Sequence, residues 1–185
     1  DLVLVETGAD IHAVNEEGDT PLHTAAWADG NNVVSILLNN GADINAVNKM
    51  GQTALHLATE DNCIDTVEVL LSQSKTKIHV PDISGDTPLI YAAGCGYTEC
   101  VKVLLNKPGY TGEQITRALN YAIESGHNDC AELIRQVGGY SEDEIRDILF
   151  DMINAESAEL QNKLMENYSS IKNLLKIQLA LQEFV

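Results

Sequence analysis

The chain has 185 residues and a formal net charge of −17 at pH 7, from 28 acidic and 11 basic residues. This length allows one elongated domain, or one domain with a small appendage. The charge leaves no basic groove for phosphates, which argues against nucleic-acid binding and against attraction to anionic membrane surfaces. An acidic surface of this kind either favours a basic partner or only maintains solubility.

Three segments share nearly the same letters at a fixed spacing. Residues 18–26 read Gly-Asp-Thr-Pro-Leu-His-Thr-Ala-Ala, residues 51–59 read Gly-Gln-Thr-Ala-Leu-His-Leu-Ala-Thr, and residues 85–93 read Gly-Asp-Thr-Pro-Leu-Ile-Tyr-Ala-Ala, so the offsets are 33 and 34. A second motif ending in Leu-Leu follows each of them. A period of this length with Thr-Pro-Leu-His inside resembles the ankyrin repeat.

The resemblance implies an all-α solenoid of helix-turn-helix units with short β-hairpin loops. We expect this ankyrin-repeat domain to cover residues 1–140. Its expected parts are a partial repeat at 1–14, repeats at about 15–47, 48–81 and 82–110, and a degenerate repeat at 111–140. The degenerate repeat lacks the Thr-Pro turn, which predicts a shortened hairpin. The chain opens inside a repeat and has no initiator Met or targeting segment, so we expect it to be a piece of a longer protein.

Residues of one type recur at the same place in each copy and predict the local structure. Threonines are expected to cap the first helix by offering a hydroxyl to its free N–H groups: Thr20, Thr53 and Thr87. Glycines two residues earlier suit a tight turn with positive φ: Gly18, Gly51 and Gly85. Asp29 and Asn62 occupy the slot of the usual glycine between the two helices. The Leu-Leu pairs are expected to bury between successive units.

The chain has four cysteines but no Cys-x-x-Cys pair, which leaves zinc and redox chemistry without their ligands. We expect Cys100 and Cys130 to be buried on second helices and Cys95 to be exposed. The resemblance implies that His23 and His56 bond backbone groups between hairpin and helix. Because no nucleophile or phosphate-loop motif is present, we expect no enzyme, no cofactor and no metal. Cysteine usage predicts a reducing compartment: cytoplasm, or host cytosol for a secreted bacterial effector.

The positions that vary between copies are the candidates for partner binding. In ankyrin repeats these are the hairpin tips and the exposed side of the first helix, which form the concave face. The first copy contributes Glu16, Glu17, Asp19, Trp27 and Ala28. The second contributes Lys49, Met50, Gln52, Glu60 and Asp61. The third contributes Ile83, Ser84, Asp86, Gly94 and Cys95.

Trp27 is the candidate anchor, because it is the sole Trp of the chain and truncation of interface Trp side chains often costs ~2 kcal/mol or more. Met50 and Ile83 at neighbouring tips would continue an apolar strip, with the acidic residues around it. The alternative is that Trp27 folds back over its neighbours.

After Ser141 the repeat pattern stops and two amphipathic helices are predicted, with Leu160, Leu164 and Tyr168 in the second. Residues 141–185 are either a helical cap, which a terminal repeat requires, or interaction helices for another chain.

We therefore predict a monomeric, non-catalytic protein–protein interaction module, an adaptor or scaffold. The alternative is the substrate-recruiting ankyrin region of a larger enzyme or bacterial effector, and a third hypothesis is self-association through 160–185.

Overall fold

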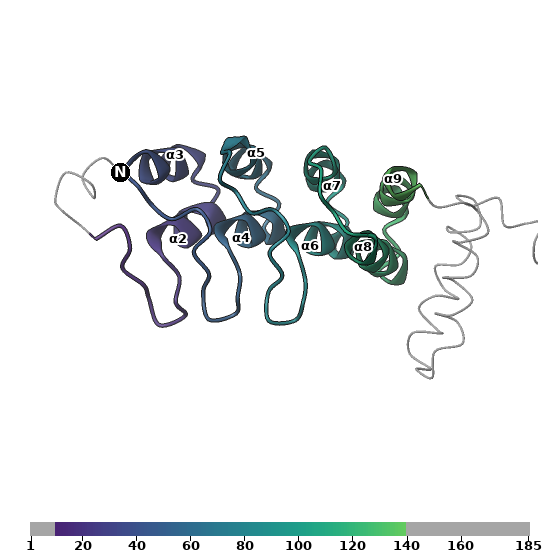
Figure 1. Ribbon diagram of the computed structural model, residues 1–185, viewed down its shortest axis with the longest axis horizontal. Coiled ribbons are helices and arrows are strands. Elements are labelled where there is room, and N and C mark those ends of the chain that lie inside the picture. The colour runs from purple at the N-terminus through teal and green to yellow at the C-terminus, as the bar shows by residue number, and fades with distance from the viewer. Residues whose placement is uncertain (1–9, 140–185) are drawn as a thin grey trace, which may run out of the picture. The chain divides into compact units, whose positions relative to one another are not determined.

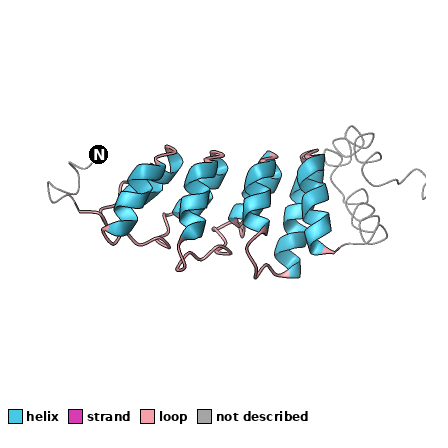
Figure 2. Cartoon of the chain, turned by 90° about the horizontal axis from the view of Figure 1, so that it is seen from above, coloured by secondary structure: helices cyan, strands magenta, loops and turns pink. Residues whose placement is uncertain are grey.

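The computed structural model describes residues 10–139; the predicted C-terminal cap at 141–185 and residues 1–9 of the partial repeat lie outside the described residues. Within 10–139 there are eight helices, labelled α2 to α9, and no strand (Figures 1 and 2). This confirms the all-α class, and the loops predicted as β-hairpins are turns. The chain divides into two compact units between Ala92 and Ala93.

The first unit stacks helix pairs in two rows. Helices α2 (Pro21–Trp27) and α4 (Ala54–Glu60) form one row, and α3 (Asn31–Asn39) and α5 (Ile64–Ser72) form the other (Figure 1). Helix α2 packs on α3 and α4, and α5 packs on α3 and α4. Leu22, Val34, Leu55, Val67 and Leu70 are fully buried between them. Each pair therefore closes its core only against its neighbour, as expected for repeats.

The loops that precede the first helices are held by one side chain each. The Asn15 Oδ1 accepts hydrogen bonds from the N–H groups of Glu17 and Asp19. In the next two repeats Asn48 and Asp82 occupy the same place and accept from the second and fourth residues that follow them. Such an Asx turn satisfies loop N–H groups that would otherwise lack partners.

His23 and His56 join successive repeats, as the resemblance implied. In each case the Thr N–H three residues earlier donates to Nδ1, at 3.1 Å and 3.0 Å. A backbone N–H can only donate, so Nδ1 is unprotonated and Nε2 carries the hydrogen. Nε2–H then donates to a carbonyl of the next loop, Gln52 at 3.0 Å and Asp86 at 3.2 Å. Both imidazoles are fully buried in this neutral form.

Two of the three threonines take part in a cap, through the histidine at the third position of the helix, and the prediction is wrong in the third repeat. Thr20 and Thr53 form capping boxes with His23 and His56. Thr87 precedes α6 (Pro88–Cys95), where Ile90 stands at the histidine position, and its buried hydroxyl has no hydrogen-bond partner. An apolar side chain at the third position of the helix removes the acceptor that the other threonines use.

The turn residues adopt the predicted backbone. Gly18, Gly51 and Gly85 have φ of 83°, 75° and 81°. Asp29 and Asn62 also have positive φ, 51° and 56°, in the slot between the two helices. Asp29 is stabilised there because its carboxylate accepts a hydrogen bond from the Thr66 hydroxyl at 2.9 Å.

The second unit contains α7 (Thr98–Leu105), α8 (Gly112–Glu124) and α9 (Asn128–Gly138), with α9 packed on both others. The shortened hairpin is confirmed: residues 106–111 lead directly into α8, and Thr111 caps it in a capping box with Gln114. Cys100 and Cys130 are buried, as predicted, and Cys95 is exposed.

Candidate binding surface

The candidate partner-binding residues lie in the loops and at the ends of first helices in the first unit. We call this surface the loop face: the exposed side chains of residues 15–19, 48–52 and 82–86 and of the C-terminal ends of α2 and α4. Glu16, Glu17, Lys49, Met50, Ile83 and Ser84 are exposed on the loops, Asp19, Gln52 and Asp86 are half-buried at their bases, and Trp27, Glu60 and Asp61 are exposed at the helix ends.

Backbone hydrogen bonds join neighbouring loop tips. The Lys49 N–H donates to the Glu17 carbonyl at 3.0 Å, and the Ile83 N–H donates to the Met50 carbonyl at 3.0 Å. Because one loop is tied to the next, the exposed side chains of Met50 and Ile83 lie on adjacent tips. The structure thus brings these two predicted site residues together.

A line of polar side chains connects the loops to the first helices. The Asn48 amide donates to Asp19 Oδ1 at 2.9 Å and to Gln52 Oε1 at 3.2 Å. Gln52 Nε2 donates in turn to the Tyr91 hydroxyl at 3.1 Å and lies 3.4 Å from Glu60 Oε2. Asp19 and Gln52 therefore hold the surface in shape, in addition to being available to a partner.

The line ends at Asp82, whose Oδ2 accepts from the Tyr91 hydroxyl at 2.8 Å. Burial works against ionisation of Asp82, but the N–H groups of Asp86 and Ser84 and the Tyr91 hydroxyl outweigh it and lower its pKa. Burial, followed by the Asp82 carboxylate, raises the pKa of Tyr91 to about 12. Asp82 is thus an ionised acceptor and Tyr91 a neutral donor near pH 7.

Asn15, Asn48 and Asp82 were not among the predicted site residues, although they shape every tip of the loop face. Their signal is present in the sequence, because each stands three residues before one of the recurring turn glycines. Tyr91 and its contact with Gln52 had no such signal, since the pair lies 39 residues apart and occurs in one repeat only.

The exposed large hydrophobic side chains of the first unit lie in the loops and at the end of α2. Trp27 is 57%, Met50 50% and Ile83 66% exposed, and Val14 and Val47 are exposed on the loops. Within the described residues, α3 and α5 expose no large hydrophobic side chain. Trp27 is the last residue of the seven-residue α2, so it lies about 10 Å along the helix axis from the loop that precedes it. The apolar groups thus form a tip patch, Met50 with Ile83, and a separate Trp27 position.

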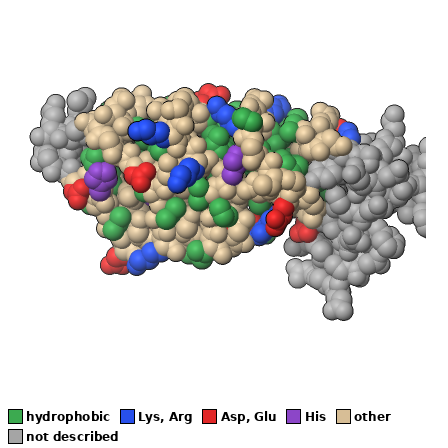
Figure 3. Space-filling view, in the orientation of Figure 1, with side chains coloured by type: hydrophobic (Ala, Val, Ile, Leu, Met, Phe, Trp, Pro, Cys, Tyr) green, Lys and Arg blue, Asp and Glu red, His purple; other side chains and the backbone are tan. Residues whose placement is uncertain are grey.

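The charged side chains of residues 10–74 are almost all acidic. Residues 10–74 contain ten Asp or Glu residues and a single basic residue, Lys49. None of these ten carboxylates forms an ion pair within the described residues. In contrast, the second unit has two ion pairs, Lys102 with Glu99 and Arg135 with Glu132. Figure 3 shows acidic, basic and hydrophobic side chains side by side along the loop tips.

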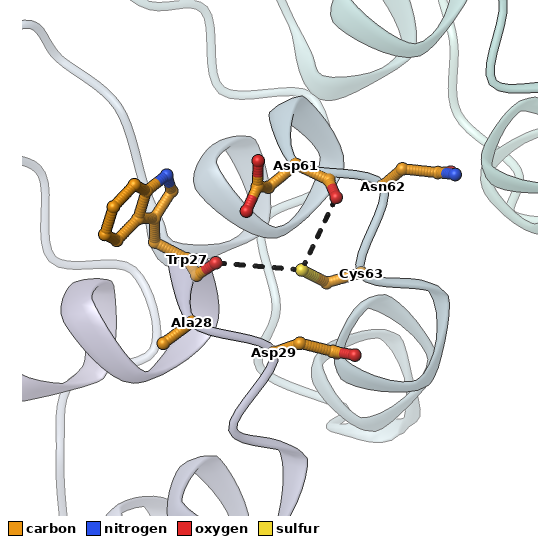
Figure 4. Close-up of a pocket in the computed structure, with 6 residues that line it drawn as sticks. All are labelled: Trp27, Ala28, Asp29, Asp61, Asn62 and Cys63. Atoms are coloured by element: carbon orange, nitrogen blue, oxygen red, sulfur yellow. Dashed lines mark hydrogen bonds between the residues drawn. The ribbon is translucent and has the colours of Figure 1, made fainter.

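A shallow depression lies beside Trp27, lined by the turns that follow α2 and α4 (Figure 4). Its lining residues are Trp27, Ala28, Asp29, Asp61, Asn62 and Cys63. The Cys63 Sγ lies 3.8 Å from the Trp27 carbonyl oxygen and 3.7 Å from that of Asp61. One thiol therefore contacts the backbone of both Trp27 and Asp61.

The titratable groups of the first unit do not resemble catalytic machinery. Burial, with the nearby carboxylates of Asp29 and Asp61, raises the pKa of Cys63 to about 11, so the nucleophilic thiolate is rare near pH 7. Burial lowers the pKa of His56, whose two ring nitrogens already bond the backbone. No three His, Cys, Asp or Glu residues of the described part are grouped so as to hold a metal ion.

Helix pairs repeated at 33 to 34 residues, joined by loops whose tips bond one another, define a helical repeat protein. The family profile described as ankyrin repeats (3 copies) matches residues 2–82 and again residues 74–143. The chain therefore belongs to the ankyrin repeat family, whose members are generally protein–protein interaction modules and typically non-catalytic. No curated protein matches the chain. No helix among residues 10–139 is both long and apolar enough to cross a membrane.

Proposed function

We propose that this chain is a non-catalytic adaptor or scaffold that binds a partner protein through the loop face. One observation carries the proposal: in residues 10–92 the exposed large hydrophobic side chains lie in the loops or at the end of α2, and not on α3 or α5. Exposed apolar groups on a folded surface indicate an interaction site when they gather on one side. Trp, Tyr and Arg are the side chains that commonly dominate interface energies.

The rigidity of the loop face supports the same function. Each tip is held by an Asx side chain and bonded to the next tip, and the loops are fixed to the helices by His23 and His56. A surface that is already ordered loses little conformational entropy when a partner binds. Met50 and Ile83 would thus be presented in fixed positions.

The cysteines support a reducing compartment such as the cytoplasm, because none of the four forms a disulfide and three of them are buried: Cys63, Cys100 and Cys130.

The test compares what wild-type chain and a variant capture from a cell lysate. The variant is Trp27→Ala with Met50→Ala, and its control is Glu68→Ala, an exposed residue on α5. All three proteins are first matched in thermal stability. The proposal expects partners that wild type and Glu68→Ala retain and that the double variant loses. Partners retained equally by all three would place binding elsewhere and contradict the proposal.

A further inference from the structure

The depression beside Trp27 presents two side chains that no other residue of 10–139 engages. The Trp27 indole is more than half exposed, and its Nε1–H forms no hydrogen bond within the described residues. The Asp61 carboxylate is exposed and likewise has no hydrogen-bond or ion-pair partner there. In Figure 4 this carboxylate points to the side on which the indole lies.

The other groups that line the depression are occupied. Asp29 points away from the indole, and its Oδ1 accepts from the Thr66 hydroxyl at 2.9 Å (Figure 4). Cys63 is buried, with its sulfur between the Trp27 and Asp61 carbonyl oxygens. The structure therefore fixes the backbone on both sides and leaves the indole and one carboxylate to face outward.

Among residues 10–139, no Lys or Arg lines this depression. Residues 10–48 contain no Lys or Arg, and Lys49 is at a loop tip, where its N–H bonds Glu17. An aromatic face attracts a cation through its quadrupole, and a carboxylate beside it adds an ion pair. A planar guanidinium can satisfy both contacts at once, because it stacks on the ring while its N–H groups donate to the carboxylate.

From this we infer that the Trp27–Asp61 depression binds an arginine side chain of the partner protein. The inference rests on the proposed function and names the chemistry of its partner: a segment that places one arginine against Trp27 and apolar residues against the Met50–Ile83 tip patch.

The experiment selects peptides from a randomised displayed library on the full chain, at a salt concentration high enough to suppress non-specific attraction to a protein of net charge −17. Selections run in parallel on wild type, Asp61→Asn and Glu68→Gln. The last two variants lose the same charge, one at the depression and one on α5, and both sites are exposed. The inference expects arginine to be enriched at one position of the peptides selected on wild type and Glu68→Gln, and less enriched there on Asp61→Asn.

A selected peptide is then titrated against the fluorescence of Trp27, which reports this site alone because the chain has one Trp. Replacing the arginine by citrulline, its neutral isostere, should weaken binding about tenfold. Asp61→Asn should weaken it about three- to fivefold, and Glu68→Gln less than about twofold.

The outcomes separate this inference from the proposed function. Peptides that bind wild type and fail on Trp27→Ala, but show no arginine enrichment or bind equally with citrulline, would overturn the arginine site and leave the loop face as the binding surface. Equal losses in Asp61→Asn and Glu68→Gln would also overturn it. If no peptide is selected on wild type, or if the selected peptides bind Trp27→Ala with Met50→Ala unchanged, both the inference and the proposed function fail.

Discussion

In the repeats of residues 15–81 the first helix has seven residues and begins with a Thr–His pair, whereas in the copy after residue 110 it has 13 residues and begins with Thr111 and Gln114. The histidine is long enough to reach a carbonyl of the next loop, which ties a protruding loop to the helix below it. Where the protruding loop is missing, a glutamine that closes the capping box locally is sufficient. The histidine therefore supports the loop, and the loop presents the candidate binding residues.

The two regions also differ in whether their carboxylates form ion pairs. In the second unit Lys102 pairs with Glu99, and the Arg135 pair lowers the pKa of Glu132. In residues 10–74 the carboxylates have no such partners among the described residues. We infer that the first region keeps its charge available for a partner, while the second neutralises part of it internally.

Removal of a linking histidine should have the largest effect on stability. His56→Ala should lower the free energy of unfolding by about 3 kcal/mol, because it removes a buried ring and leaves the Thr53 N–H and the Asp86 carbonyl without their bonds. Ile90→Val changes the equivalent position in the next repeat, where no such bond exists, and should cost only about 1 kcal/mol. Urea unfolding at pH 7 measures both, and equal losses would contradict the linking role.

A second prediction concerns close contact in the turn before α7. Gly96 has φ of 77°, and a Cβ added there would lie 2.5 Å from His127 Nδ1. Gly41 has φ of 93°, but a Cβ there would meet nothing within 4 Å. Gly96→Ala should therefore cost about 2 kcal/mol or more, and Gly41→Ala about 1 kcal/mol, the conformational part alone. Thermal unfolding of the two variants tests this; a larger loss at Gly41 would show that the His127 contact is unimportant.

Replacing Thr53 and Thr87 by valine should change the stability by smaller amounts, and the two variants control for each other. Thr53→Val should destabilise the protein by about 1–2 kcal/mol, because its hydroxyl lies 2.9 Å from His56 Nδ1 and takes part in a capping box. Thr87→Val should be neutral or slightly stabilising, since the buried hydroxyl there has no partner to lose. Denaturation midpoints decide the question, and a cost at Thr87 equal to that at Thr53 would mean that Thr87 has a bond that the structure lacks.

The pH dependence of the free energy of unfolding tests the role of His56. Its pKa is lowered in the folded state, so below about pH 6.5 the unfolded chain takes up a proton that the folded chain excludes. The contribution of His56 is complete above about 6.5 and declines as the pH falls toward the folded value. Asp82, whose pKa is also lowered, keeps its contribution above 3.8 and loses it only as the pH falls below that value, in a separate and more acidic window. Unfolding curves from pH 7.5 to 5 should lose stability in wild type and less so in His56→Ala; parallel curves would contradict this.

The smallest expected effect is at the proposed anchor. Trp27→Ala should change the free energy of unfolding by less than about 0.5 kcal/mol, because more than half of the side chain already faces solvent. Thermal unfolding checks this expectation. A loss of several kcal/mol would mean that Trp27 covers its neighbours and supports the fold instead of binding.

Much of the fold could be predicted from the sequence, because each repeat carries its own signals. The turn glycines, the positive φ of Asp29 and Asn62, and the backbone bonds of His23 and His56 follow from motifs within one unit. Thr87 was mispredicted, since its cap depends on a histidine that the third copy replaces with Ile90. The contacts of Cys63 with Trp27 and Asp61 could not be predicted, because they arise only when the turns of two repeats pack together.

The most direct test of the central claim is amide hydrogen exchange of the full chain, alone and with the partner that it captures. If the loop face binds, new protection should appear in the tips at 49–52 and 82–86 and around the end of α2 near Trp27, while α3 and α5 exchange as before. Protection confined to α3, α5 or the second unit, with unchanged exchange in these tips, would contradict the account.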